Sequence, residues 1–451
     1  MGENKFLSGI VFTLIIFGLI NGFSIFNLSN QTKILALPGD TWTTPQNITL
    51  VNNIAFISNN NFRNILVDSD GNIHVVYYGI SDNPTGNREI YYVTNSSGTW
   101  SGANVSRVNY SGVWQSDPSI ALDSHGVLHV VWTGLYPGAT DKELFYANNS
   151  GGFWSTPYNV TKTATSDDSY PALVIDSQNN LHIVYLDYDA FMLKYVNRTY
   201  SGSWSTPIDL LKSPYIFTNE LSRPTIAVDS NNHLFIAFSG ANSTYNNEIY
   251  LINNAAGHWS TPYNVTSDSL TGDWDDDLPY ISIDSQNRIH IAWLTTNFTV
   301  YGLKYRSYAN NVWSTPVYIT LSDSKDIFGF SMYPDFNGEL HLCYDRNDGG
   351  GLYNIYYVNN TGGAWHTPVL VLNSSDNELN PNIMVDNQGY AHIVFSSSKI
   401  YFHVNYVRST TPVAYQILGP VSEDYTLIIA IGVTVIIIVL AVAVYILKIR
   451  K

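Results

Sequence analysis

Short apolar runs separated by polar turns repeat along residues 41–408 with a period near fifty. Each copy has an apolar run ending in Asp, a polar turn, a second run that usually carries a His, a third run rich in Tyr, and a Trp that opens a fourth run. Residues 168–209 show this plan most clearly. Alternating apolar and polar positions are typical of half-buried β-strands. Four short strands per copy at this period predict the blades of a β-propeller.

The turn Asp occurs seven times, at Asp68, Asp123, Asp176, Asp229, Asp284, Asp335 and Asp386. Beyond Asp68, the Trp that opens the fourth run occurs only six times, at Trp100, Trp154, Trp204, Trp259, Trp313 and Trp365. The last copy, 379–408, stops after its third run, and Trp42–Thr49 precedes the first copy with only a fourth-run pattern. We therefore predict an all-β, seven-bladed propeller of four-stranded antiparallel blades. Its N-terminal strand (41–52) completes blade seven and closes the ring, which removes an aggregation-prone edge.

Two recurring residues bear on packing. A Pro stands five residues before the Asp in five copies and predicts a strand start there; Arg63 and Phe330 replace it in blades one and six. The second run carries His74, His129, His182, His290, His341 and His392, with Phe235 in blade four. Packed sheets lie about 10 Å apart, too far for histidines of different blades to share a zinc ion. We expect each ring to bond a neighbouring turn.

The two ends differ from the repeat. Residues 1–26 are mostly apolar and predict a signal peptide or an N-terminal anchor, followed by a linker over 27–40. Residues 409–424 predict a stalk, 425–447 a transmembrane helix, and 448–451 a basic cytoplasmic tail. The chain is thus predicted to be a single-pass protein of the cell membrane with an extracellular propeller. Many Asn-x-Ser/Thr sequons agree with a glycoprotein.

Composition narrows the choice of partners. The net charge is −15, which disfavours nucleic acid because its phosphates would be repelled. The single cysteine, Cys343, excludes an internal disulfide and lies in an apolar run, where we expect a packed thiol. We predict extracellular glycans or proteins as partners and the membrane as the site of attachment.

The turn before each Trp resembles the Asp-box, or BNR, repeat of sialidase-like propellers. Copies read Asn148-Asn-Ser-Gly-Gly-Phe-Trp154 and Asn359-Asn-Thr-Gly-Gly-Ala-Trp365. The Trp, the Gly and the location match, whereas the Asp of the motif is replaced by Asn or another small polar residue. The resemblance covers most of 41–408 and implies the propeller fold; the Asp-box itself is a structural turn and implies no catalysis.

The same resemblance implies what a hydrolase of this class would need: three arginines on a substrate carboxylate, a Tyr–Glu nucleophile pair and an acidic Asp. Phe62-Arg63-Asn64-Ile65 is similar to the stretch that holds the first arginine. Arg223, with Glu220 nearby, and Arg346 are the other candidates. The alternative is that all three arginines are isolated loop cations.

The loops leading into the blades and those between second and third strands share one face, where a ligand is expected. Candidates on this face are Trp132, Trp293, Tyr185, Asp168 and Asp277. Exposed aromatic rings there would stack on sugars, with packing between blades as the alternative. The run Asp273-Trp-Asp-Asp-Asp277 predicts a solvated acidic rim; Asp273, Asp275 and Asp277 are the candidate ligands if Ca²⁺ binds. No other cofactor is expected.

Three functions remain open at this stage. The first is a cell-surface binding or adhesion module for glycans or proteins, the second an extracellular sialidase-like glycoside hydrolase, and the third a structural envelope glycoprotein. Convergence of the three arginines in one pocket would favour the hydrolase. An aromatic shelf without them would favour a lectin.

Overall fold

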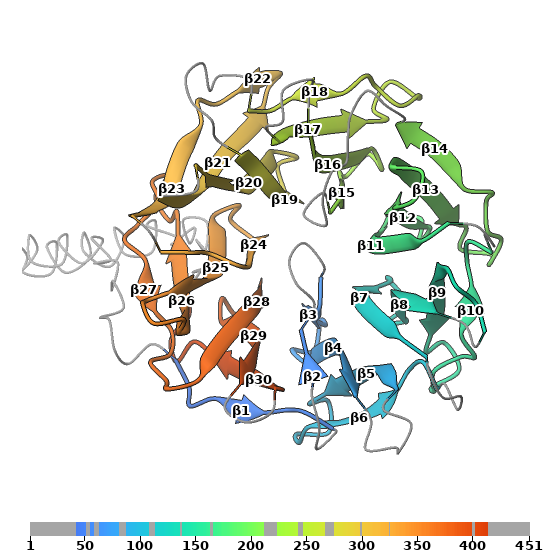
Figure 1. Ribbon diagram of the computed structural model, residues 1–451, viewed down its shortest axis with the longest axis horizontal. Coiled ribbons are helices and arrows are strands. Elements are labelled where there is room, and N and C mark those ends of the chain that lie inside the picture. The colour runs from blue at the N-terminus through green and yellow to red at the C-terminus, as the bar shows by residue number, and fades with distance from the viewer. Residues whose placement is uncertain are drawn as a thin grey trace, which may run out of the picture.

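The computed structural model of the protein describes residues 42–50, 55–57, 63–80, 87–107, 113–135, 138–162, 166–211, 223–241, 247–266, 275–297, 300–323, 325–398 and 402–413. Seven antiparallel sheets follow one another around a ring (Figure 1). The predicted all-β, seven-bladed propeller is confirmed. In these ranges no helix has the length and apolar character needed to span a membrane. The segments 1–26, 27–40, 425–447 and 448–451 lie outside the described residues.

The strands of the first four blades run as follows. Blade one holds β2 (Ala55–Phe56), β3 (Ile65–Val67), β4 (Ile73–Ile80), β5 (Arg88–Thr94) and β6 (Ser101–Asn104). Blade two holds β7 (Gln115–Leu122), β8 (Leu128–Leu135), β9 (Lys142–Asn148) and β10 (Tyr158–Asn159). Blade three holds β11 (Asp168–Ile175), β12 (Leu181–Asp187), β13 (Met192–Arg198) and β14 (Ile208–Leu211). Blade four holds β15 (Thr225–Val228), β16 (Leu234–Ala241), β17 (Asn247–Asn253) and β18 (Tyr263–Asn264).

The remaining three blades complete the ring. Blade five holds β19 (Asp275–Ile283), β20 (Ile289–Thr296), β21 (Val300–Ala309), β22 (Val312–Trp313) and β23 (Val317–Asp323). Blade six holds β24 (Phe330–Pro334), β25 (Leu340–Asn347), β26 (Tyr353–Asn359) and β27 (Val369–Leu370). Blade seven holds β28 (Asn377–Val385), β29 (Ala391–Ser398), β30 (Phe402–Arg408) and β1 (Gln46–Asn47). Blades one and five keep four strand positions, because β2 and β3 both pair with β4, and β22 and β23 both pair with β21.

The N-terminal strand closes the ring as predicted. β1 pairs antiparallel with β30, with Gln46 opposite Tyr406, and the two strands lie side by side in Figure 1. Beyond the strand, the Thr43 N–H donates to the Arg408 carbonyl at 2.8 Å. Ile48 is only 2% exposed and joins the core of blades one and seven. The first and last parts of the chain therefore share one sheet.

The repeated Pro stands at a strand start only in blade four, where Pro224 directly precedes β15; the other four copies differ from the prediction. In blades two, three, five and seven it lies inside the innermost strand, where the pairing register shifts by one residue. The residue before it has positive φ in each case: Asp117 (53°), Tyr170 (60°), Leu278 (52°) and Asn380 (56°). Pro cannot donate a ladder hydrogen bond, and a β-bulge is a position that tolerates this loss. The bulge also re-aims the side chain that precedes the Pro.

The repeated Asp, His, Tyr and Trp form one network per blade, as expected for packing histidines. In six blades His Nδ1 lies 2.6–2.8 Å from a Tyr hydroxyl of the third strand. His Nε2 lies 2.9–3.4 Å from the turn Asp. The same Tyr packs edge-on against the Trp of the next blade at 5.1–5.3 Å. Blade four has Phe235 and Leu251 at the His and Tyr positions, so both hydrogen-bonding partners are replaced together.

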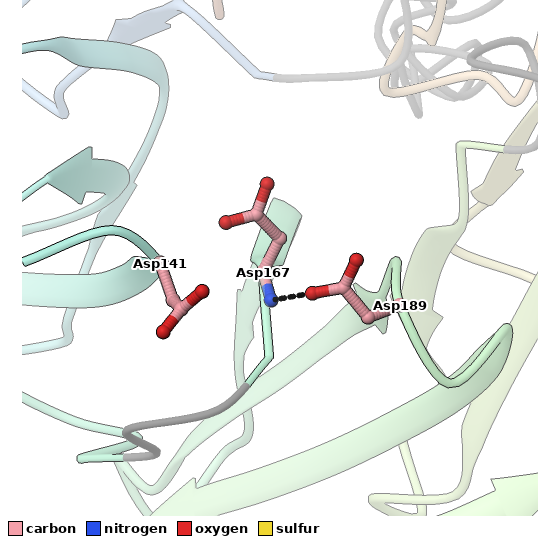
Figure 2. Close-up of side chains that lie close together, drawn as sticks. All are labelled: Asp141, Asp167 and Asp189. Carbon is pink, nitrogen blue, oxygen red and sulfur yellow. Dashed lines mark hydrogen bonds between the residues drawn. The ribbon is translucent and has the colours of Figure 1, made fainter.

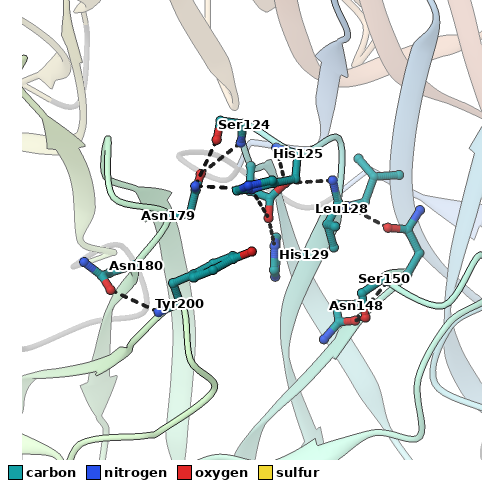
Figure 3. Close-up of polar contacts among 12 residues, drawn as sticks. Ser124, His125, Leu128, His129, Asn148, Ser150, Asn179, Asn180 and Tyr200 are labelled. Carbon is teal, nitrogen blue, oxygen red and sulfur yellow. Dashed lines mark hydrogen bonds and ion pairs between the residues drawn. The ribbon is translucent and has the colours of Figure 1, made fainter.

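A second contact locks neighbouring turns together (Figure 3). Asn179 of blade three accepts the Ser124 N–H at 2.9 Å and donates to the Ser124 hydroxyl at 2.9 Å. Asn232 accepts from Ser177 in the same way, and Asn287 from Ser230. All three Asn residues have φ between 59° and 67°, a conformation that Asn tolerates better than most residues. These contacts join blades two to five.

Blade two carries Gly126 at the corresponding position, with φ 78° and no atom within 4 Å of an added Cβ. We expect Gly126→Asn to bond Ser69 of blade one, which contributes about 0.5–1.5 kcal/mol; a side chain at this positive φ offsets part of that gain, so the net stabilisation should stay below about 1 kcal/mol. A modest rise in the thermal unfolding midpoint would show this. Gly338→Asn is the matched control and should lower the midpoint, because its Cβ would lie 2.5 Å from Arg288 Nη2. Equal effects of the two variants would contradict the role of this contact.

Several Asn-x-Ser/Thr triplets form hydrogen bonds within the blades. The hydroxyls at their third positions accept the N–H of a third-strand residue at 2.9–3.1 Å; the acceptors are Thr49, Ser106, Thr161 and Thr266. The Asn of the triplet caps the following turn, as Asn47 does for the Thr49 N–H at 2.9 Å. This pattern is ordinary Asx-turn chemistry. Glycosylation of these sequons stays a prediction.

Candidate functional site

Five side chains gather on the face where the chain enters each blade. Strands one and three begin there and strand two ends there, because neighbouring strands are antiparallel. Tyr78 stands near the end of β4, Arg88 begins β5, Trp114 precedes β7, Asp117 lies in its bulge, and Arg223 precedes β15. We call these five residues the mouth cluster.

Arg88 and Trp114 form its most exposed part. The Arg88 Cζ lies 3.8 Å from the Trp114 ring centroid and 5.5 Å from that of Tyr78. Trp114 is 50% exposed, although such a large aromatic side chain is usually well buried. Backbone bonds fix its position: the Arg88 N–H donates to Val113 O at 3.3 Å, and the Leu135 N–H to Trp114 O at 2.9 Å. A half-exposed indole is therefore held beside a guanidinium group.

Asp117 and Arg223 carry the charges of the second part of the site, and Tyr78 adds a phenol. Burial raises the pKa of Tyr78 to about 12; Asp117 adds to the rise, while Arg88 and Arg223 oppose it. The phenol is thus neutral at physiological pH and can donate a hydrogen bond. Arg223 is 8% exposed and lies 4.8 Å above the Tyr170 ring. The cluster combines an exposed indole for stacking with the Arg88 guanidinium, which suits an anion, and the largely buried Arg223 adds positive charge.

The other two predicted arginines lie elsewhere. Arg63 lines a central cavity of about 400 Å³ at the opposite, Asp-turn end of the channel, and bonds Tyr280. Arg346 donates to Asp348 Oδ1 from both Nε (2.9 Å) and Nη2 (2.8 Å). The three arginines therefore have different neighbours. Glu220 lies outside the described residues.

The aromatic residues predicted for the ligand face belong to the core, which corrects that interpretation. Trp132 and Trp293 are 1% exposed and Tyr185 is fully buried, so no sugar ring can reach them in this arrangement. They occupy one position of the second strand, three residues after the His. All seven blades place a fully buried aromatic residue there: Tyr77, Trp132, Tyr185, Phe238, Trp293, Tyr344 and Phe395. The alternative of packing between blades holds for them.

The predicted acidic ligands serve mainly as acceptors within the fold. Asp168 is fully buried and Asp277 is 5% exposed. The Asn247 N–H donates to Asp275 Oδ1 at 3.0 Å, and Asn247 Nδ2 donates to Asp277 Oδ2 at 3.1 Å. Burial raises the pKa of Asp277 to about 6. Asp273 lies outside the described residues, and calcium binding by this run stays a prediction.

A different acidic group has metal-like spacing (Figure 2). Asp141, Asp167 and Asp189 offer carboxylate oxygens that all lie within 4.8 Å of one another. The sequence pattern did not single out these three residues as a group, because they come from loops of different blades; their one signal is that they are acidic residues in loops of the shared face. Lys142 Nζ lies 3.4 Å from Asp167 Oδ2 and already balances part of the charge.

The sequence matches no protein-family model and no curated protein. Solved structures with similar folds include an ulvan lyase bound to GlcA(1-4)Rha3S, at TM-score 0.54 and 11% identity over 78% of this chain and 94% of that one. A lectin from Burkholderia pseudomallei gives TM-score 0.52 and 14% identity over 78% and 96%. A Hadza microbial sialidase gives a lower TM-score of 0.45 and 10% identity over 71% of this chain and 73% of that one. These similarities show a shared β-propeller fold.

Proposed function

We propose that the protein is a glycan-binding module whose mouth cluster recognises acidic sugars. The observation that carries this is the half-exposed Trp114 indole 3.8 Å from the Arg88 guanidinium, with Arg223 nearby. An aromatic ring provides a stacking surface for a sugar, and a guanidinium group bonds carboxylate or sulfate in a bidentate manner.

Two further considerations support a glycan partner. The ulvan lyase structure is bound to GlcA(1-4)Rha3S and the Burkholderia protein is a lectin, so this fold is compatible with carbohydrate binding. Display at a cell surface, with the propeller outside and 425–447 in the membrane, forms part of the proposal and rests on the apolar pattern of the two ends.

Binding to an array of neutral, carboxylated and sulfated oligosaccharides tests the proposal. We expect the wild-type chain to retain acidic glycans, and Trp114→Ala and Arg88→Ala each to weaken that binding about tenfold or more. Phe153→Ala is the matched control, since Phe153 is 71% exposed in the turn after β9, on the opposite face, and should not change binding.

Two results would contradict the proposal. If the protein bound only neutral glycans on the array, the guanidinium groups would have no role in recognition. Release of a fluorophore from a sialoside reporter, abolished in Arg223→Ala, would instead favour the hydrolase that the arginines first suggested.

A further inference from the structure

Blade five differs from the others at its outer rim. Its outermost strand β23 spans seven residues, Val317–Asp323, whereas the outermost strands of the other blades span two to four. β23 pairs on one side with β21. Among the described residues no strand pairs with its other side. β23 is therefore the longest outermost strand in the described structure and lies at the rim of the ring (Figure 1), and one of its two edges has no strand partner among the described residues.

Such an edge is a template for another strand unless it is short or charged, or carries a Pro. Of the seven residues of β23 only the last, Asp323, is charged, and none is Pro. Val317 is 42% and Tyr318 45% exposed. The register shifts at Ile319, whose side chain is buried against the blade, so the irregularity leaves Val317 and Tyr318 at the surface.

We propose that the free edge of β23 pairs with β23 of a second copy of this chain, antiparallel about a two-fold axis. Pairing a strand with its own copy about a two-fold axis is self-complementary and closes after two subunits. Charge favours this partner. The chain carries a net charge of −15, so most surfaces of two copies repel one another. β21 and β23 carry two cations, Lys304 and Arg306, and one carboxylate, Asp323, so this rim is not acidic and two otherwise acidic molecules can approach one another there.

Sedimentation velocity of the purified full chain tests this at about 1 and 100 µM. We expect the wild-type mass to rise toward twice the monomer value with concentration. Val317→Lys/Tyr318→Lys should remain monomeric, because both side chains are exposed and edge lysines oppose strand pairing. Leu370→Lys is the matched control: Leu370 is 40% exposed on β27, the two-residue outermost strand of blade six, and the variant should still dimerise.

A cross-linking experiment provides a second measurement. Tyr318→Cys should form an intermolecular disulfide under mild oxidation, because this side chain is 45% exposed on the edge, whereas Leu370→Cys should not. The native Cys343 is fully buried and should not interfere. A dimer that persists in the double lysine variant would overturn the proposal. A wild-type chain that stays monomeric would also overturn the proposal. If that monomer binds a synthetic peptide of residues 317–323, the edge pairs with a foreign extended segment and not with a second copy.

Discussion

Deleting residues 42–50 is expected to lower the unfolding midpoint by roughly 10 °C or more, or to leave the protein aggregated. This segment supplies the outermost strand of blade seven and ties the two ends of the propeller together. Without it, blade seven would keep three strands, and β30 would become an open edge. The ring would then have to hold together through inner-strand contacts between blades seven and one.

The contacts of the segment account for the size of the effect. Ile48 is buried in the core of blades one and seven, and losing such a side chain costs about 2–5 kcal/mol. The Trp42 ring packs edge-on against Tyr357 of blade six at 5.3 Å. The Val404 N–H donates to Thr49 Oγ1 at 2.9 Å, and the Leu50 N–H to the Tyr77 hydroxyl at 2.7 Å. One short segment thus contacts three blades.

Differential scanning calorimetry of the deleted and intact chains measures this effect. Gln46→Ala is the control, because it removes one partly exposed hydrogen bond to Trp100 and should cost less than about 1 kcal/mol. A deleted chain that melts with the intact one would show that ring closure does not depend on β1.

Replacing Asp345 by Ala is expected to destabilise the fold by about 3–5 kcal/mol. Asp345 lies in β25 and is fully buried. Its Oδ1 accepts the N–H groups of Phe328 (2.7 Å) and Gly329 (2.8 Å), and its Oδ2 accepts that of Asn380 in blade seven (2.8 Å). Truncation would leave three buried donors without an acceptor, at the point where blades six and seven meet.

The same residue should make stability depend on pH. Burial raises the pKa of Asp345 from 3.8 to about 7, and Asp326 adds to the rise. Between about pH 4 and 7 the folded state holds a proton that the unfolded state releases, so the contribution of this group to stability falls as pH rises through that window. The full cost, roughly 4 kcal/mol, is reached above pH 7. Cys343 and Tyr353 also face this carboxyl but ionise only at higher pH.

Asp345→Asn isolates this effect, because it keeps the shape but cannot ionise. We expect the variant to be less stable than wild type at pH 5, since its Nδ2 replaces one acceptor. At pH 8 the gap should narrow or reverse. Denaturant unfolding at the two pH values measures it, and a gap independent of pH would contradict the raised pKa.

The order of strands could be read from the sequence because each blade repeats the same local chemistry. The sequence has seven turn aspartates but only six tryptophans after the first of them, and Trp42–Thr49 matches the missing fourth strand. The number of blades and the closure of the ring therefore followed from counting. The role of the histidines also followed, since residues in different blades cannot share a metal ion. The Pro position was wrong in four of the five blades that carry it, because a bulge inside a strand and a strand start look alike in a single run of residues.

The functional site depended on tertiary structure. Trp132 and Trp114 are both aromatic residues near the same face, yet one is 1% and the other 50% exposed. Burial depends on what neighbouring blades place over a side chain, and no local pattern encodes that. Arg88 and Trp114 come from different blades and meet only after the ring has formed. By itself the sequence determined the repeat, the turns and the closed ring, since these arise from residues near one another in the chain. The mouth cluster, the acidic group around Asp167 and the free edge of β23 were decided only when the blades packed, because each depends on distances between segments far apart in sequence.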